Sequence, residues 1–134
     1  MATWDDVRRL ALALPETSEK GDGDFSQWRV KDKLFVWMRP LRKSDFEALG
    51  AAAPQGPILG ARTDGFAAKD ALLSAPGEVY FTTPHFNGYP AILVQLDNIE
   101  SDELEELVTE AWATQAPKRL AADYFKVRPS NQEG

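Results

Sequence analysis

The chain has 134 residues, no cysteine and a net charge of −6. This length fits one domain, because two halves would be too small to bury a good hydrophobic core. Without cysteine, a disulfide framework, a thiolate metal site and a cysteine nucleophile are excluded. Apolar residues make up 43% of the chain, which is typical of a globular protein. We expect a single domain over residues 1–127 and a frayed tail over residues 128–134.

The first residues are acidic, whereas a signal peptide begins with positive charge and continues into an apolar run. No window approaches the ~20 apolar residues that a membrane span needs. We therefore expect a cytoplasmic protein without a membrane segment.

The N-terminal third predicts one helix and two strands. Thr3 is a candidate N-cap, an apolar stripe follows at helical spacing, and Pro15 ends the helix. Residues 16–24 are polar, contain two glycines and predict a loop. Residues 25–30 and 34–39 predict two strands of a hairpin that reverses at 31–33.

The middle of the chain predicts shorter elements. Ser44 and Glu47 have the spacing of a capping box, which predicts a helix over residues 45–51, and residues 58–63 predict a third strand. Asp64 is a candidate cap for a helix to about residue 74. Residues 78–83 and 90–96 predict two more strands, and the Asn87-Gly88 pair favours a tight reversal with positive φ between them.

The C-terminal third predicts two helices. Ser101 is a candidate cap for the clearest helix, whose apolar stripe is Leu104, Leu107, Val108, Ala111 and Trp112. Pro117 suits the first position of a short helix to about residue 124. The element order favours an α+β fold, in which an antiparallel sheet of about five strands carries helices on one face as a two-layer sandwich.

Several segments resemble one known family. They are Leu10-Ala11-Leu12-Ala13-Leu14-Pro15-Glu16 with Glu19, the hairpin from Trp28 to Phe35, the block from Tyr80 to Pro90 with Ile92 to Leu96, Glu103-Leu104 with Glu110-Ala111-Trp112, and Ala116-Pro117-Lys118. In these residues the chain resembles MmcQ/YjbR-like proteins from residue 3 to about 125. The resemblance implies a CyaY-like (frataxin-like) fold and a DNA-binding role based on hairpins in a double-wing arrangement.

Charge is unevenly distributed along the chain. Residues 26–43 carry a net charge of +5, while residues 97–110 hold seven acidic and no basic residues. Long basic side chains on a hairpin suit phosphate contacts. The candidate nucleic-acid-binding residues are Arg29, Lys31, Lys33, Arg39, Arg42 and Lys43. The same residues also suit an edge hairpin whose charges keep sheets from pairing.

A second candidate site is a small-ligand pocket or protein-interaction surface around the 82–89 turn and an aromatic sheet face. Its residues are Trp37, His85, Asn87 and Tyr89. Because a lone histidine is a poor zinc site, we expect His85 to hold the turn by hydrogen bonds. If one face of the strand 34–39 packs on the helices, Trp37 either lies on a covered face or is exposed for stacking.

The chain contains no P-loop, G-x-G-x-x-G, H-E-x-x-H or G-x-S-x-G motif. We therefore expect no catalytic residues, no cofactor and no metal. The first hypothesis is a non-enzymatic DNA-binding module, and the alternative is the small-ligand or protein-interaction domain. A monomer or a weak homodimer is expected.

Overall fold

The computed structural model describes residues 2–21 and 25–127, so the expected tail at 128–134 lies outside the described residues. The α-helices are α1 (Trp4–Leu12), α2 (Lys43–Leu49), α3 (Gly65–Leu73), α4 (Ser101–Gln115) and α5 (Lys118–Val127). The strands are β1 (Thr17–Lys20), β2 (Gln27–Val30), β3 (Lys33–Met38), β4 (Ile58–Arg62), β5 (Tyr80–Phe81) and β6 (Ala91–Gln95). Short 3-10 helices are η2 (Gly50–Ala52), η3 (Pro84–Phe86) and η4 (Leu96–Asn98).

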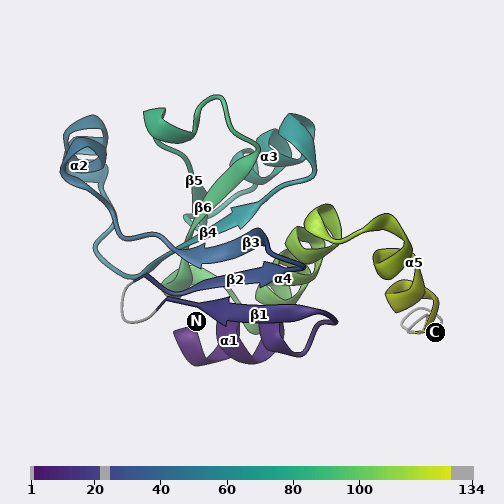
Figure 1. Cartoon of the computed structure of the whole chain (residues 1–134). Coiled ribbons are helices and arrows are strands. Elements are labelled where there is room, and N and C mark those ends of the chain that lie inside the picture. Colours follow the sequence, from purple (N-terminus) through teal and green to yellow (C-terminus); the bar gives the residue numbers. More distant parts are fainter. Residues whose placement is uncertain (1, 22–24, 128–134) are drawn as a thin grey trace.

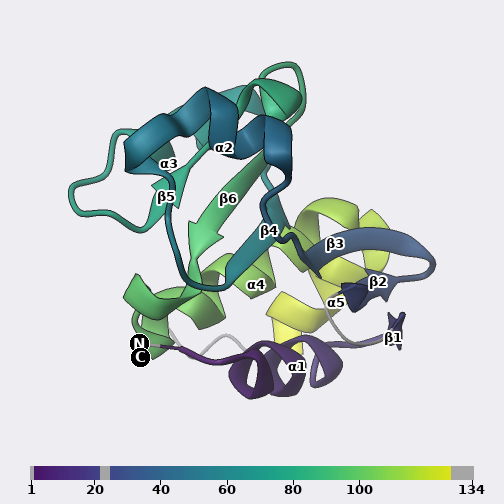
Figure 2. The ribbon, with the colours of Figure 1, turned by 90° about the vertical axis from the view of Figure 1, so that its left-hand side faces the viewer.

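The six strands form one antiparallel sheet in the order β1-β2-β3-β4-β6-β5 (Figure 1). This confirms the predicted α+β fold with an antiparallel sheet, which has one strand more than expected. Figures 1 and 2 both place α1 beside β1, and α2 and α3 toward the other end of the sheet.

The strand register assigns each side chain to one of two faces, because residues directly opposite each other in a sheet point to the same side. One row runs across all six strands and consists of Lys20, Gln27, Trp37, Gly60, Leu93 and Phe81. The neighbouring row consists of Glu19, Trp28, Val36, Ala61 and Ile92 and points to the opposite side. We call the first side the groove face and the second the helix face.

A bulge in β3 allows both faces to be apolar. Trp28 pairs with Val36 and Arg29 with Leu34, so Phe35 has no partner in the register. Phe35 and Val36 both belong to the core of the helix face, while Trp37 packs on the groove face. The extra residue therefore lets an almost continuous apolar strand serve two separate cores.

The helix face holds the main core, and α4 is its principal helix. The predicted stripe of α4 is confirmed, since all five of its residues are buried. Trp112 is fully buried, and its indole N–H donates a hydrogen bond of 3.0 Å to the carbonyl oxygen of Pro15. This bond joins α4 to the end of the first helical segment.

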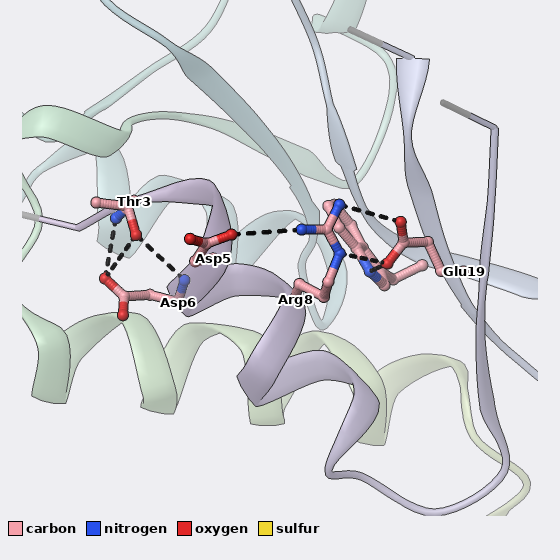
Figure 3. Close-up of polar contacts among 6 residues, drawn as sticks. Thr3, Asp5, Asp6, Arg8 and Glu19 are labelled. Atoms are coloured by element: carbon pink, nitrogen blue, oxygen red, sulfur yellow. Dashed lines mark hydrogen bonds and ion pairs between the residues drawn. The ribbon is translucent and has the colours of Figure 1, made fainter. Parts of the chain in front are cut away.

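Polar contacts attach α1 to the edge of the sheet (Figure 3). The Thr3 hydroxyl accepts a hydrogen bond from the Asp6 N–H, which confirms Thr3 as the N-cap. Arg8 Nε lies 2.8 Å from the Glu19 carboxylate, which also accepts a 3.0 Å bond from the Trp28 indole. The Arg8 hydrogen bond, which outweighs the cost of burial, holds the pKa of Glu19 below its ordinary value.

The prediction of a loop over residues 16–24 was wrong for residues 17–20, which form the edge strand β1. The segment lacks apolar alternation because neither side of this edge strand is strongly buried. Its side chains instead make polar contacts: Glu19 binds Arg8 and Trp28 on the helix face, and Lys20 lies 3.3 Å from Asp32. An edge strand held by charges gives no period-two apolar signal.

Three local predictions also need correction. Helix α2 begins at Lys43, because Asp45, and not Glu47, reaches back to the N–H of Arg42. Ser101 is the first residue of α4 rather than its N-cap. The expected strand 78–83 is reduced to Tyr80–Phe81, because the chain turns away at Thr83 into η3.

Gly60 provides a test of this packing. A Cβ at position 60 would lie 2.4 Å from the indole ring of Trp37. We expect Gly60→Ala to push the indole out of place and to lower the free energy of unfolding by ~1–3 kcal/mol, as overpacking does. Urea unfolding measures the change. The control is Gly88→Ala, because nothing lies within 4 Å of a Cβ there; equal stability of the two variants would contradict the packing of Trp37 on Gly60.

Candidate functional site

A groove of about 870 Å³ lies on the groove face of the sheet. Its aromatic lining comes from separate parts of the chain and comprises Phe25, Trp37, His85, Phe86 and Tyr89. Gln27 of β2 and two arginines, Arg39 and Arg42, supply polar groups. The volume is within the range of small-molecule sites, which are largely apolar with a few polar groups.

The floor of the groove is Trp37. It is 9% exposed and packs beside Phe86, with ring centroids 6.4 Å apart. The indole lies over β4, where Gly60 has no side chain to exclude it. The absence of a side chain at Gly60 therefore determines how closely the Trp37 indole approaches β4, and with it the depth of the groove.

One wall of the groove is the segment 84–89, and a buried lysine holds it. Lys69 of α3 is only 4% exposed, and its ammonium donates hydrogen bonds to the carbonyl oxygens of Phe86 and Tyr89. Burial lowers the pKa of Lys69. No sequence pattern indicates this role, because a lysine in a helix usually faces solvent.

The expected reversal at Asn87-Gly88 was wrong in its backbone geometry. Asn87 has φ −59°, in the right-handed helical region, and Gly88 is not among the residues with positive φ. The segment turns through the 3-10 helix η3 instead. Asn87 is exposed and does not line the groove, whereas Trp37, His85 and Tyr89 do.

Among the described residues, His85 makes no hydrogen bond that would hold this wall, contrary to expectation. Its ring is exposed and meets Phe86 edge to face at 4.8 Å, and within residues 2–21 and 25–127 no hydrogen bond to it occurs. Tyr89 is better fixed. Its hydroxyl accepts a 2.7 Å hydrogen bond from Arg62, whose guanidinium lies 4.8 Å from the centre of the tyrosine ring.

A buried ion pair lies beside the segment 84–89, next to Phe86. Arg39 Nη2 lies 3.0 Å from the Asp45 carboxylate, without hydrogen-bond geometry, and both side chains are almost fully buried. Burial alone raises the pKa of Asp45, but the Arg42 N–H and the Arg39 guanidinium outweigh burial and hold the pKa below its ordinary value. The Arg39 guanidinium also stacks over Phe86 at 5.3 Å. The pair therefore fastens α2 to the groove.

The six basic candidate residues do not share one surface. Arg39 is buried in its ion pair. The guanidinium of Arg29 donates hydrogen bonds to the side chain of Gln27 and to the carbonyl oxygen of Asp32 within the hairpin. Lys31 and Lys33 are exposed at the hairpin tip, and Lys33 pairs with Val30, which turns it toward the helix face.

The remaining two candidates, Arg42 and Lys43, are exposed at the start of α2. They follow the far end of β3, about 20 Å from the hairpin tip at ~3.3 Å per residue. Four exposed cations thus form two pairs at opposite ends of one strand.

The acidic segment is separate from the groove. Helix α4 packs on the helix face, where the Tyr80 hydroxyl donates a hydrogen bond to Glu103. Burial, together with the neighbouring carboxylates, raises the pKa of Tyr80. Among the described residues no cluster of three or more acidic or histidine side chains is arranged to hold a metal ion. In that same part of the chain, no helix is long and apolar enough to cross a membrane.

The sequence profile of the YjbR family matches residues 12–114. The chain belongs to the YjbR family. It is 55% identical over 128 residues to the uncharacterised protein Rv2570 of Mycobacterium tuberculosis and to the uncharacterised protein Mb2600 of Mycobacterium bovis, covering 93% of this chain and 97% of each relative.

Among solved structures, this YjbR-family chain is similar to protein DR2400 of Deinococcus radiodurans, a DUF419 protein. The TM-score is 0.59 at 18% sequence identity, and the match covers 84% of this chain and 77% of the other. At that identity the likeness shows a shared fold.

The role of Lys69 in this YjbR-family chain can be tested by Lys69→Met. The substitution keeps the apolar stem but leaves two carbonyl oxygens without their charged donor. We expect a loss of ~2–3 kcal/mol in the free energy of unfolding, and faster amide hydrogen exchange over residues 84–89. Lys43→Met is the control, since Lys43 is exposed. Unchanged exchange in this segment would rule out Lys69 as its anchor.

Proposed function

We propose that this YjbR-family chain is a non-enzymatic binding module that holds a small ligand with a flat, apolar body in the groove. The observation that supports this most strongly is the aromatic lining, which brings Trp37, Phe86 and Tyr89 together from β3 and the segment 84–89. Flat aromatic ligands gain from stacking on such side chains and from leaving water.

The polar contacts that fix the lining of the groove also support a binding role. A preformed site binds more tightly because less side-chain and loop freedom is lost on binding. In this groove, Lys69 fixes the segment 84–89 through two carbonyl oxygens, and the Arg39–Asp45 pair fixes the start of α2 beside it. Phe25, which is 71% exposed, extends the apolar surface at the rim.

Binding to DNA is the second candidate, and the separation of charge favours it. Lys31, Lys33, Arg42 and Lys43 are exposed, and Arg42 lines the groove, whereas the acidic helix α4 packs on the helix face. The two pairs of cations could contact phosphates at two points along a backbone. This candidate does not use the apolar floor of the groove.

The groove can be tested with N-phenyl-1-naphthylamine, an uncharged aromatic probe that fluoresces in apolar sites. We expect saturable binding to the parent protein and at least a tenfold loss of affinity in Gly88→Phe. Gly88 lines the groove and a Cβ there has nothing within 4 Å, so we expect the new ring to occupy part of the groove without clashing at its Cβ. The free energy of unfolding should stay within ~0.5 kcal/mol, as for most surface changes.

Gly77→Phe serves as a control for added surface aromatic area, because Gly77 lies outside the groove lining. Its positive φ of 95° makes that variant less stable, so affinity is compared only at temperatures where both variants are folded. A parent protein that does not bind the probe, or equal affinity in parent and Gly88→Phe, would refute the proposal.

DNA binding is tested by titrating duplex DNA at several salt concentrations. Four exposed cations predict a slope of log K against log salt of about −3.6, at ~0.9 per phosphate contact. Reversing Lys31 and Lys33 to glutamate should flatten the slope by about two units. Reversing Lys118 and Lys126, which are exposed on α5, changes the net charge equally and serves as the control. If the tip variant and the control bind alike, the hairpin does not contact DNA.

A further inference from the structure

The charged side chains that line the groove are all cationic. They are Arg39 and Arg42, and among the described residues no carboxylate belongs to the lining. The two arginines differ in what neutralises them. Arg39 is paired with Asp45, whose lowered pKa keeps the carboxylate ionised. Arg42 is exposed, and its guanidinium has no partner within the described part of the chain. Among the described residues, the lining of the groove therefore holds one positive charge that no carboxylate neutralises.

The backbone of Arg42 is held in a defined position. Its N–H donates a 2.9 Å hydrogen bond to Asp45 Oδ2, and it immediately precedes the first turn of α2. The same carboxylate faces Arg39 at 3.0 Å. One buried aspartate thus neutralises the inner arginine and fixes the backbone from which the outer arginine extends. Because its backbone is fixed at the groove, the Arg42 guanidinium is placed to bind an anion there.

Gln27 adds a hydrogen-bond donor to the lining. Its Oε1 accepts bonds of 3.0 Å and 2.8 Å from Arg29 Nε and Nη2. Because the oxygen is occupied, the group that Gln27 still offers is its NH₂, which only donates. Arg29 therefore determines which end of the Gln27 amide is free, and that end also favours a negatively charged or carbonyl oxygen.

We infer that the ligand of this groove carries one carboxylate or phosphate group on its flat apolar body, and that Arg42 is the residue that selects it. This inference rests on the proposed function, since it names the ligand class of the same groove. The aromatic floor holds the body, Arg42 binds the anionic group, and Gln27 donates to an oxygen of the ligand. A cationic ligand of the same shape is disfavoured by the uncompensated arginine.

The test uses two probes with the same aromatic body. N-phenyl-1-naphthylamine is neutral, and 1-anilinonaphthalene-8-sulfonate adds one negative charge. Both are titrated against the parent protein, Arg42→Gln and Lys43→Gln at physiological salt. Lys43 is the matched control, because it is the adjacent exposed cation and does not line the groove.

We expect the parent to bind the sulfonate about tenfold more tightly than the neutral probe, which corresponds to about 1.4 kcal/mol. Arg42→Gln should remove that preference and leave the affinity for the neutral probe within about twofold. Lys43→Gln should change neither affinity by more than about twofold, since salt screens charges outside direct contact. Melting temperatures should be equal in all three proteins, because neither side chain has a partner among the described residues.

The outcomes separate the two proposals. If the neutral probe does not bind the parent, the groove is not a ligand site and both proposals fail. If it binds but the sulfonate binds no more tightly, or if Arg42→Gln and Lys43→Gln have equal effects, only the anion inference fails. A second set of titrations assigns the kind of anionic head group. The affinity for indole-3-acetate is compared with that for indole-3-acetamide to test a carboxylate, and the affinity for adenosine monophosphate with that for adenosine to test a phosphate. Preference for the charged member of either pair, lost in Arg42→Gln, supports the inference, and preference in neither pair overturns it.

Discussion

The close approach of Trp37 to Gly60 is the contact on which the groove depends. An indole that packs this closely against a central strand needs a residue without a side chain beneath it, and β4 supplies one at position 60. The bulge at Phe35 completes the arrangement, because it turns Trp37 toward the groove while Phe35 and Val36 enter the main core. The sheet therefore packs against helices on its helix face and also carries an aromatic surface on its groove face.

Buried polar groups hold the walls above this floor. An ammonium at Lys69 and an ion pair at Arg39 and Asp45 are expensive to bury, and hydrophobic side chains of similar size would often be at least as stable. Their effect is to fix positions. Each of these groups holds a segment outside the sheet in one place through directional bonds or stacking. We take this as the physical reason that a chain with short elements around the groove can hold the groove in one defined shape.

Sequence patterns predicted the elements whose side chains are periodically apolar. The stripe of α4 and the central strands were found because burial on one face leaves a period in the sequence. β1 was missed because an edge strand held by Glu19 and Lys20 has no such period. For the groove, Trp37, His85 and Tyr89 were named, but Gln27, Phe25 and Lys69 were not, since their roles depend on contacts between segments far apart in sequence. Arg39 was assigned to the surface because of its charge alone. Its ion pair with Asp45 was not foreseen, because Asp45 lies in the next helix.

The proposal that ligands bind on the groove face of this YjbR-family chain can be tested with the indole N–H resonances of its four tryptophans. Trp37→Phe assigns the resonance of the groove. On titration with 1-anilinonaphthalene-8-sulfonate, we expect the Trp37 resonance to shift with the binding curve, while those of Trp28 and Trp112, fully buried on the helix face, stay in place. Saturable binding that shifts Trp28 or Trp112 and leaves Trp37 unmoved would contradict it.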